Sequence, residues 1–589
     1  IGMLLAEGET RFDVLVLQPQ SSAWLLYNDD DIERSTNIGM INMGLLNLIN
    51  ILETAQIQLH LGDDRIIDRY GNVNASKFDV GSQSYSVIIV PPCLTLAGTT
   101  FEKLKTFKAN GGNLIFAGEI PTMIDGVVSG EIGLLAKDCP NVETENVADI
   151  IPDQFKKVQI MVKNGKSANG IASTVRYFDD FTMLYFANTR GQECDADISF
   201  IGKSVEEFNY DNGTVKGIYY ETSDDRIIIK HHFYEKSSVV YFVYNDFRAK
   251  SVLDICDGLV PVNTKISCLW QIAERDENAL TLDFCDCMID GELIGKNIPV
   301  NDIQEIAIAY KRKVNISMDF HISVKTAPKG QLCLAVENPG NYDILLDGKY
   351  IEQKPAGWYR DKTFIKLDIS GLLFAGDHVL TLKTAFCQSQ KTYDYIERCF
   401  AFESEKNKLS YDMEIEAIYL IGDFGVFSPH KPVTVGHNGE EIAGDFEIAE
   451  APDAVLPGNV VSQGYPFFNG RMVLKNTVTL KAGEIENRSI SFERRCAVVT
   501  KVKVNGIQAG MVLWQPYEIS LKGLLHEGVN IIEVELIGSL RNLLGPHHLH
   551  EDSYSVSPGS FFHNSPIWRG GLNKRWNDAY VFAPFGLFI

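Results

Sequence analysis

The sequence predicts a multidomain, mainly β protein with a single α/β domain near its N-terminal end. Strand-length apolar runs alternate with helical patterns only between residues 12 and about 125. Beyond that point, short β-rich segments alternate with turn signals, as in antiparallel sandwiches. A strand–turn–strand–loop–strand unit then occurs twice, at residues 345–382 and 504–536, which indicates two related sandwich domains.

Residues 12–150 form the predicted α/β domain. Residues 38–54 carry apolar side chains at helical spacing. The predicted strands are residues 12–17, 57–61, 85–90 and 113–118. Because strands alternate with helices and the strands are continuously apolar, we expect a parallel sheet covered on both faces, of the flavodoxin-like or Rossmann-like kind.

This type of sheet often binds nucleotides, but the first predicted strand is followed by neither GxGxxG nor GxxxxGK[ST]. Cys93 follows the third strand without a supporting histidine nearby. Glu119 and Asp125 follow the fourth strand, at the edge where open sheets bind ligands, although capping a helix is the commoner role of such acids. We therefore expect a structural or oligomer-forming sheet.

The remaining chain divides into three predicted β domains. Residues 151–255 form a small antiparallel sandwich, 256–430 a jelly-roll sandwich with the first repeat copy, and 431–589 a jelly roll with the second. Asp347-Gly348 and Asn505-Gly506 predict two-residue hairpin turns, because these residues tolerate positive φ.

Composition excludes several classes of partner and compartment. With 54 basic against 77 acidic residues the net charge is −23, which disfavours nucleic acid. No apolar run reaches the roughly 18–20 residues of a membrane span, and no signal peptide opens the chain. The 11 cysteines, an odd number without a CxxC pair, favour a reducing compartment. We expect a cytoplasmic bacterial protein, with secretion open if the natural N-terminus lies upstream.

Several segments carry a specific resemblance. Residues 504–506 (VNG), Trp514 and 528–530 (GVN) resemble the galactose-binding-like jelly roll of family-2 glycoside hydrolases. Four further segments resemble the C-terminal half of large bacterial glycosyl hydrolases akin to the α-L-rhamnosidases of glycoside hydrolase family 106. These are residues 418–425 (IYLIGDFG), 464–468 (GYPFF), 541–548 (RNLLGPHH) and 558–562 (PGSFF). The N-terminal sheet is similar to the amidotransferase-like domain that some β-galactosidases carry behind their barrel.

In those relatives the catalytic carboxylates lie on a TIM barrel that precedes these domains. A barrel takes about 250 residues, and far fewer residues of this chain lie in alternating strands and helices. The resemblance therefore implies an accessory half without catalytic residues. Residues 1–11 then form the tail of a missing upstream domain, and an upstream barrel and carbohydrate are the expected partners; oligomers stay open. Alternatives are a free-standing carbohydrate-binding protein and a small-molecule enzyme using the α/β domain. A closed ring of parallel strands, or two glutamates facing each other across a deep acidic cavity, would contradict an accessory role.

Aromatic side chains and polar residues on loops are the expected sugar contacts. The candidates are Trp568, Arg569, His547, His548, Tyr465 and Phe467. The other tryptophans considered are Trp358 and Trp514, which match in the repeat and suggest a shared structural role, and Trp576.

No metal ligand and no cofactor are predicted, with calcium the one option left open. The histidine cluster at 547–552 is a weak metal signal, and a structured loop or a sugar cleft are its other interpretations. The acidic runs 28–31 and 63–64 offer oxygen ligands for calcium, although such runs are usually solvated loops.

Overall fold

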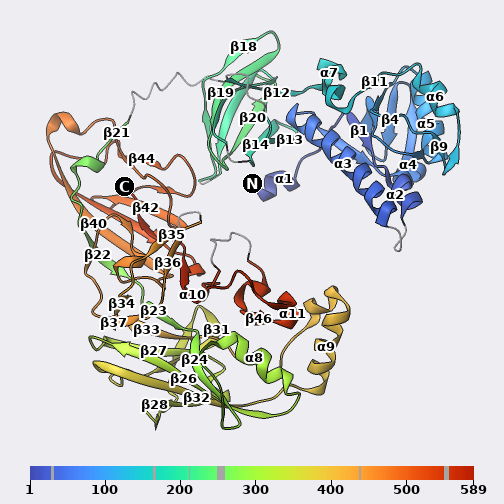
Figure 1. Ribbon diagram of the computed structural model, residues 1–589. Coiled ribbons are helices and arrows are strands. Elements are labelled where there is room, and N and C mark those ends of the chain that lie inside the picture. Colours follow the sequence, from blue (N-terminus) through green and yellow to red (C-terminus); the bar gives the residue numbers. More distant parts are fainter. Residues whose placement is uncertain are drawn as a thin grey trace. The chain divides into compact units, whose positions relative to one another are not determined.

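The computed structural model describes residues 1–27, 32–163, 168–190, 192–210, 212–248, 259–436, 439–549 and 556–589. The fold is mainly β, with 43% strand and 21% helix. The chain forms two compact units, Ile1–Ile255 and Cys256–Ile589, each with several sheets (Figure 1). The prediction of a multidomain, mainly β protein is therefore confirmed.

The first unit opens with α1 (Gly2–Ala6) and continues into a five-stranded sheet of order β11-β8-β6-β1-β2. Its strands are β1 (Val14–Leu17), β2 (Leu59–Gly62), β6 (Val87–Val90), β8 (Asn113–Ala117) and β11 (Asn141–Val142). Every neighbouring pair is parallel, as the apolar runs predicted.

Helices cover both faces of this sheet. Val14 and Val16 pack in one cluster with α3 (Ile32–Thr54) and α7 (Val147–Ile150). Leu15 and Leu17 point to the other face. The elements packed there include α4 (Asp64–Tyr70), α5 (Gly98–Ala109) and α6 (Glu131–Ala136). Smaller elements complete this part: α2 (Gln20–Leu26) and the short strands β3 (Gly71–Asn74), β4 (Lys77–Val80), β5 (Gln83–Tyr85), β7 (Thr95–Leu96), β9 (Met123–Ile124) and β10 (Val127–Val128).

An antiparallel sandwich follows in the same unit. One sheet has the order β12-β15-β19-β18 and the other β13-β14-β20-β16-β17. The strands are β12 (Val158–Val162), β13 (Ile171–Tyr177), β14 (Thr182–Asn188), β15 (Cys194–Ile201), β16 (Ser204–Asn209), β17 (Thr214–Gly217), β18 (Glu221–Ser223), β19 (Arg226–Phe233) and β20 (Ser238–Tyr244). Leu4 and Leu5 of α1 pack against its apolar residues, among them Phe242.

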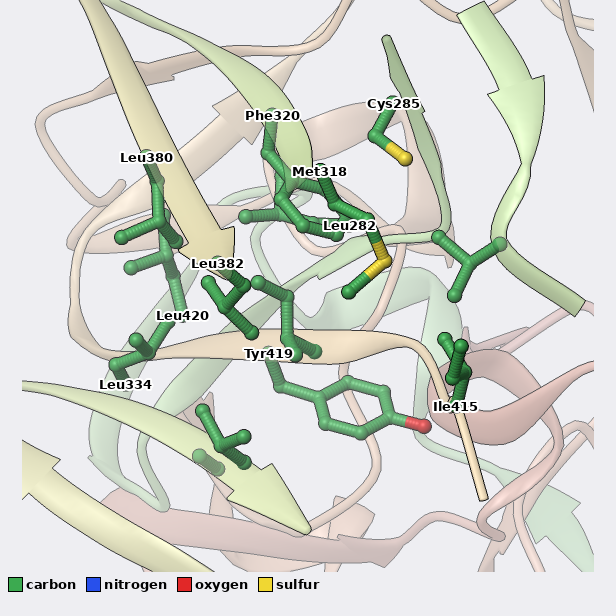
Figure 2. Close-up of a cluster of buried hydrophobic side chains, with 14 of the residues drawn as sticks. Leu282, Cys285, Met318, Phe320, Leu334, Leu380, Leu382, Ile415, Tyr419 and Leu420 are labelled. Carbon is green, nitrogen blue, oxygen red and sulfur yellow. The ribbon is translucent and has the colours of Figure 1, made fainter. Parts of the chain in front are cut away.

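The second unit contains a larger sandwich with one sheet of order β23-β33-β27-β31-β30. The facing sheet runs β25-β24-β26-β32-β28-β29, joined by β34 (Gly425–Phe427) and β37 (Glu447–Ala449). The strands are β23 (Asn278–Leu282), β24 (Phe284–Ile289), β25 (Glu292–Pro299), β26 (Val314–Val324), β27 (Lys329–Glu337), β28 (Asp343–Leu346), β29 (Lys349–Tyr350), β30 (Pro355–Tyr359), β31 (Asp361–Asp368), β32 (Gly376–Phe386) and β33 (Ile418–Asp423). Helices α8 (Val300–Ala309) and α9 (Gln390–Ala401) lie between these strands in the chain. Figure 2 shows part of its core, including Leu334, Leu382 and Leu420.

A second sandwich in this unit has the sheets β38-β22-β40-β45-β42-β43 and β21-β41-β44. Its strands are β21 (Val260–Pro261), β22 (Trp270–Arg275), β38 (Ala454–Val455), β40 (Arg471–Leu480), β41 (Arg488–Ser491), β42 (Val499–Val504), β43 (Ile507–Val512), β44 (Glu518–Ser520) and β45 (Gly528–Ile537). Because β21 and β22 precede the first sandwich in the chain, strands of the second sandwich lie on both sides of the predicted boundary at 430.

The C-terminal segment, residues 540–589, returns to the first sandwich. Leu543, Ile567 and Phe582 are buried in the core of that sandwich. The segment contains α10 (Arg541–Leu544), α11 (Pro566–Arg569), β46 (Asn564–Ser565), β47 (Gly571–Leu572), β48 (Tyr580–Phe582) and β49 (Gly586–Leu587). Strand β48 extends the small sheet of β35 (Val433–Val435) and β36 (Gly439–Ile442), and β49 pairs with β39 (Gly458–Asn459).

The predicted repeat has the same architecture in both copies. Asp347 and Asn505 have φ of 49° and 52°, and the glycine after each also has positive φ, as a two-residue hairpin turn requires. In each copy the strand before the turn pairs with the last strand, β28 with β32 and β42 with β45. The turn side chain also accepts a hydrogen bond from that last strand, at the backbone nitrogen of Val379 or Ile531.

The matching tryptophans of the repeat are both partly exposed. Trp358 is 55% exposed and Trp514 is 40% exposed. Trp358 lies in β30, and Trp514 lies between β43 and β44. Neither side chain is therefore part of a buried core, and the shared structural role of the pair stays a prediction.

The described cysteines are all free thiols. None of the helices that the structure describes is long and apolar enough to cross a lipid bilayer.

Leu420 tests the core of the first sandwich, because this side chain has no exposed surface. We expect Leu420→Ala to lower the free energy of unfolding of the second unit by about 2–5 kcal/mol, since it leaves a cavity between the two sheets. Leu372→Ala is the control, because Leu372 is 43% exposed. Urea unfolding of the two variants checks the difference, and equal effects would contradict the packing described.

Candidate functional site

A cavity of about 590 Å³ lies in the second unit, between the first sandwich and the C-terminal segment. Its lining comes from the end of β23, the start of α8, the end of β27, the β30–β31 hairpin and the stretch that leads into β33. The C-terminal segment supplies the rest, at residues 540–576. Small-molecule sites are typically concave spaces of about 300–1,000 Å³, so the size suits a ligand.

Aromatic side chains make up much of this lining. They are Tyr359, Phe364, Tyr411, Tyr419, Phe561, Phe562, Trp568 and Trp576. Trp568 is positioned by α11, where Pro566 opens the helix and the hydroxyl of Ser565 accepts a hydrogen bond of 3.2 Å from the backbone nitrogen of Trp568. Trp576 is fixed by its indole nitrogen, which donates to Asp578 at 2.9 Å.

Three glutamates give the cavity an acidic wall. Glu337 ends β27, and Glu414 and Glu416 lie just before the neighbouring strand β33. Their carboxylate oxygens lie within 4.8 Å of one another. Glu414 and Glu416 are two residues apart, so in extended chain their side chains share a side.

No cation among the described residues forms an ion pair with these three carboxylates. Burial, reinforced by the charges of Glu337 and Glu414, raises the pKa of Glu416 to about 7. Burial also raises the pKa of Glu337 and of Glu414. Part of the Glu416 side chain is exposed to the cavity, but protein atoms surround its carboxyl group. The carboxylate is therefore poorly hydrated, which favours its protonated form.

Asp283 forms the floor of the cavity, directly after β23. Tyr580 donates a hydrogen bond of 2.6 Å to its Oδ1 atom, and His548 Nε2 and His547 Nδ1 lie 3.1 and 3.7 Å from Oδ2. Burial opposes ionisation of Asp283, but the contacts with His547 and His548 outweigh it and hold its pKa well below the usual value. Burial lowers the pKa of His547 and raises that of Tyr580.

Of the six sugar-binding candidates, the structure brings His547, His548 and Trp568 together in this cavity. Arg569 anchors a neighbouring loop, where its Nη1 atom donates to the carbonyl of Gly559 at 3.0 Å. Tyr465 and Phe467 have no exposed surface, and both belong to hydrophobic cores. Neither can stack on a sugar, so these two candidates are withdrawn.

Sequence reasoning missed Asp283, Glu337, Glu414 and Glu416. The signals were faint: Asp283 interrupts an apolar stretch between Leu282 and Phe284, and Glu414 and Glu416 alternate with apolar residues. Asp283 and His548 are 265 residues apart, so no local pattern could unite them.

The acids and the thiol of the α/β domain have ordinary structural surroundings. Asp125 accepts a hydrogen bond of 2.9 Å from the backbone nitrogen of Gly98, at the start of α5, and Glu119 is exposed. Asp63 caps α4, while Asp64 accepts from Ser21 and Thr100. Burial raises the pKa of Cys93 to about 12, which keeps the thiol unreactive. The acidic run 28–31 and residues 550–552 lie outside the described residues.

No family model and no curated protein sequence matches this chain. Its structural neighbours are glycoside hydrolases. A rhamnosidase from Novosphingobium sp. PP1Y aligns with 98% of this chain and 39% of its own, at 12% identity and a TM-score of 0.44. An exo-carrageenase GH42 from Bacteroides ovatus aligns with 40% of this chain and 30% of its own, at 11% identity and a TM-score of 0.27. The α-L-rhamnosidase of Streptomyces avermitilis covers 65% of this chain and 32% of its own, at 8% identity and a TM-score of 0.14. The chain thus spans well under half the length of each.

Glu416→Gln tests the raised pKa of Glu416 in the acidic wall. Because the pKa of Glu416 is raised in the fold to about 7, the unfolded chain loses this proton first, and wild-type stability falls as the pH rises from about 4.5 to 7. The variant lacks this loss. With solvent screening, we expect it to be more stable than wild type by about 1 kcal/mol at pH 8 and equal at pH 4.

Thermal melting at the two pH values measures this difference. Glu292→Gln, at the exposed first position of β25, is the matched control and should follow the wild type at both pH values. A difference in melting temperature between Glu416→Gln and wild type that is the same at both pH values would contradict the raised pKa of Glu416.

Proposed function

We propose that this chain is an accessory, carbohydrate-binding region of a glycoside hydrolase, and that the cavity of the second unit is its sugar site. The observation that carries the proposal is a cavity of about 590 Å³ that combines the indoles of Trp568 and Trp576 with clustered carboxylates. The C–H face of a pyranose stacks on aromatic rings, and its hydroxyls donate hydrogen bonds to carboxylate oxygens.

We further propose that a catalytic TIM barrel acts together with this chain. The resemblance of residues 418–425, 464–468 and 541–548 to family 106-like enzymes supports this, because the catalytic carboxylates of those enzymes lie on such a barrel. In the same proposal the sheet of order β11-β8-β6-β1-β2 is an amidotransferase-like, flavodoxin-like domain. The two repeat-bearing sandwiches are galactose-binding-like jelly rolls. The free thiols of the described residues support a reducing compartment such as the bacterial cytoplasm.

A second candidate function is glycoside hydrolysis in this cavity itself. It is favoured by Glu416, whose raised pKa of about 7 suits a general acid, beside two further glutamates. An accessory region was not expected to contain an acidic cavity of this kind. Against hydrolysis, the carboxylates cluster on neighbouring strands within 4.8 Å, whereas glycosidases place their pair on either side of the scissile bond, about 5–10 Å apart.

Trp568→Ala separates sugar binding from its alternatives. A panel of plant and host glycans should raise the melting temperature of the wild-type chain, because a ligand at about 100 times its Kd adds roughly 2.7 kcal/mol of stability. The variant should lose most of this shift, whereas Trp514→Ala, whose indole is exposed outside the cavity, should keep it.

A flat response of the wild-type chain across the panel would overturn the binding proposal. The same preparations are tested for release of aryl aglycones. The accessory role predicts none, and turnover that Glu416→Gln abolishes would instead assign hydrolysis to the cavity.

A further inference from the structure

We propose that Asp283, His547 and His548 form a binding site for a first-row transition metal ion of the Zn²⁺ type at the floor of the cavity. The site does not depend on the proposed sugar-binding function, because its three ligands and their supports all belong to this chain. It rests on the directions of the two imidazole rings, on the distances between the ligand atoms, and on the contacts behind them.

The hydrogen bonds of the two histidines with backbone carbonyls fix which ring nitrogen of each faces Asp283. His547 Nε2 lies 3.0 Å from the carbonyl oxygen of Asn542, and His548 Nδ1 lies 3.1 Å from that of Ala579. A carbonyl only accepts, so these two nitrogens carry hydrogen. A neutral imidazole then has its lone pair on the other nitrogen, His547 Nδ1 and His548 Nε2. A ring N–H donated to a backbone carbonyl is the usual support of a metal-binding histidine.

Both free nitrogens converge on one carboxylate oxygen. Oδ2 of Asp283 lies 3.1 Å from His548 Nε2 and 3.7 Å from His547 Nδ1, and the three atoms are all within 4.8 Å of one another. Ligand atoms bound to one Zn²⁺ at about 2.0–2.2 Å stand about 3–4 Å apart. Without an ion, the 3.1 Å contact is a hydrogen bond that needs a proton on His548 Nε2, and His547 Nδ1, at 3.7 Å, is too far from Oδ2 for a second one. A cation between them satisfies all three.

The surroundings hold these ligands in place. Tyr580 donates to Oδ1 of Asp283 at 2.6 Å, which leaves Oδ2 free for the ion. The indole of Trp576 packs on the His548 ring at a centroid distance of 4.8 Å, and Phe467 packs edge-on against His547 at 5.6 Å. His547 is 4% exposed and His548 6%. Rotation of either ring is therefore restricted before any ion binds.

The donor set selects the class of ion. Two imidazole nitrogens and one carboxylate oxygen suit Zn²⁺, Co²⁺ or Ni²⁺, whereas Ca²⁺ and Mg²⁺ prefer oxygen ligands throughout. Because all three side chains line the cavity, the remaining coordination positions would be filled from it, by water or by a bound hydroxyl. Adjacent histidines can share one ion here because residues 545–548 form a loop rather than a strand.

The test uses the complete chain, freed of metal with a chelator, and titrates it with Zn²⁺ alone, without sugar. Bound metal is measured by elemental analysis after gel filtration. We expect the wild-type chain to retain one equivalent of Zn²⁺. His547→Gln and His548→Gln should each weaken Zn²⁺ binding by about a hundredfold or more, because loss of a group that only supports a ligand already costs about 10–100-fold. The matched control is His378→Gln. His378 is also buried beside a carboxylate, 2.7 Å from Asp347, but this pair belongs to no group of three potential metal ligands among the described residues. This variant should bind Zn²⁺ as wild type does.

Equal Zn²⁺ retention by wild type and by both cavity variants would overturn the proposal, because the metal would then be held elsewhere, for example by thiols. Thermal melting reports whether each variant folds. Should a variant not fold, wild-type crystals soaked with Zn²⁺ decide. An anomalous scattering peak between Asp283, His547 and His548 supports the site, and the absence of a peak there refutes it.

Discussion

The buried carboxylate of Asp283 is the interaction on which the second unit depends. A carboxylate removed from water costs several kcal/mol unless it is paired and hydrogen-bonded. All its partners come from the far end of the chain: His548 lies 265 residues and Tyr580 lies 297 residues further along. These contacts therefore require the C-terminal segment to return to the first sandwich from the second.

This return path also creates the cavity. Leu543, Ile567 and Phe582 enter the core of the first sandwich and fix the segment at several points. The same segment contributes Trp568 and Trp576 to the cavity lining, which also includes Glu337 at the end of β27 and the two glutamates before β33. The aromatic and the acidic parts of the lining thus come from segments that are distant in sequence.

The cavity combines two environments that most proteins avoid. Three carboxylates stand together without a cationic partner among the described residues, and the pKa of each is raised by burial. In the same cavity, two imidazoles and a carboxylate converge, and only one of the two imidazoles lies within hydrogen-bond distance of the carboxylate. Local arrangements that cost stability tend to persist where they serve a function, and both sets of groups face the same space.

The sequence by itself determined the features that depend on short-range physics. The apolar runs predicted the strands of the parallel sheet. Asp347-Gly348 and Asn505-Gly506 predicted the two hairpin turns, because these residue types tolerate positive φ. Of the candidate site, the sequence supplied His547, His548 and Trp568 as residue types suited to binding. It could not supply Asp283, Glu337, Glu414 or Glu416 as their neighbours.

Only the tertiary structure decided which aromatic side chains meet a cavity. Tyr465 and Phe467, which were expected to contact sugar, are buried in hydrophobic cores, while Trp358 and Trp514 are partly exposed. The burial of an aromatic ring depends on which sheet faces its strand, and strand β22 joins a sheet whose other members follow it by about two hundred residues. Contacts at that separation are set by the packing of whole domains, and no window of sequence contains both partners.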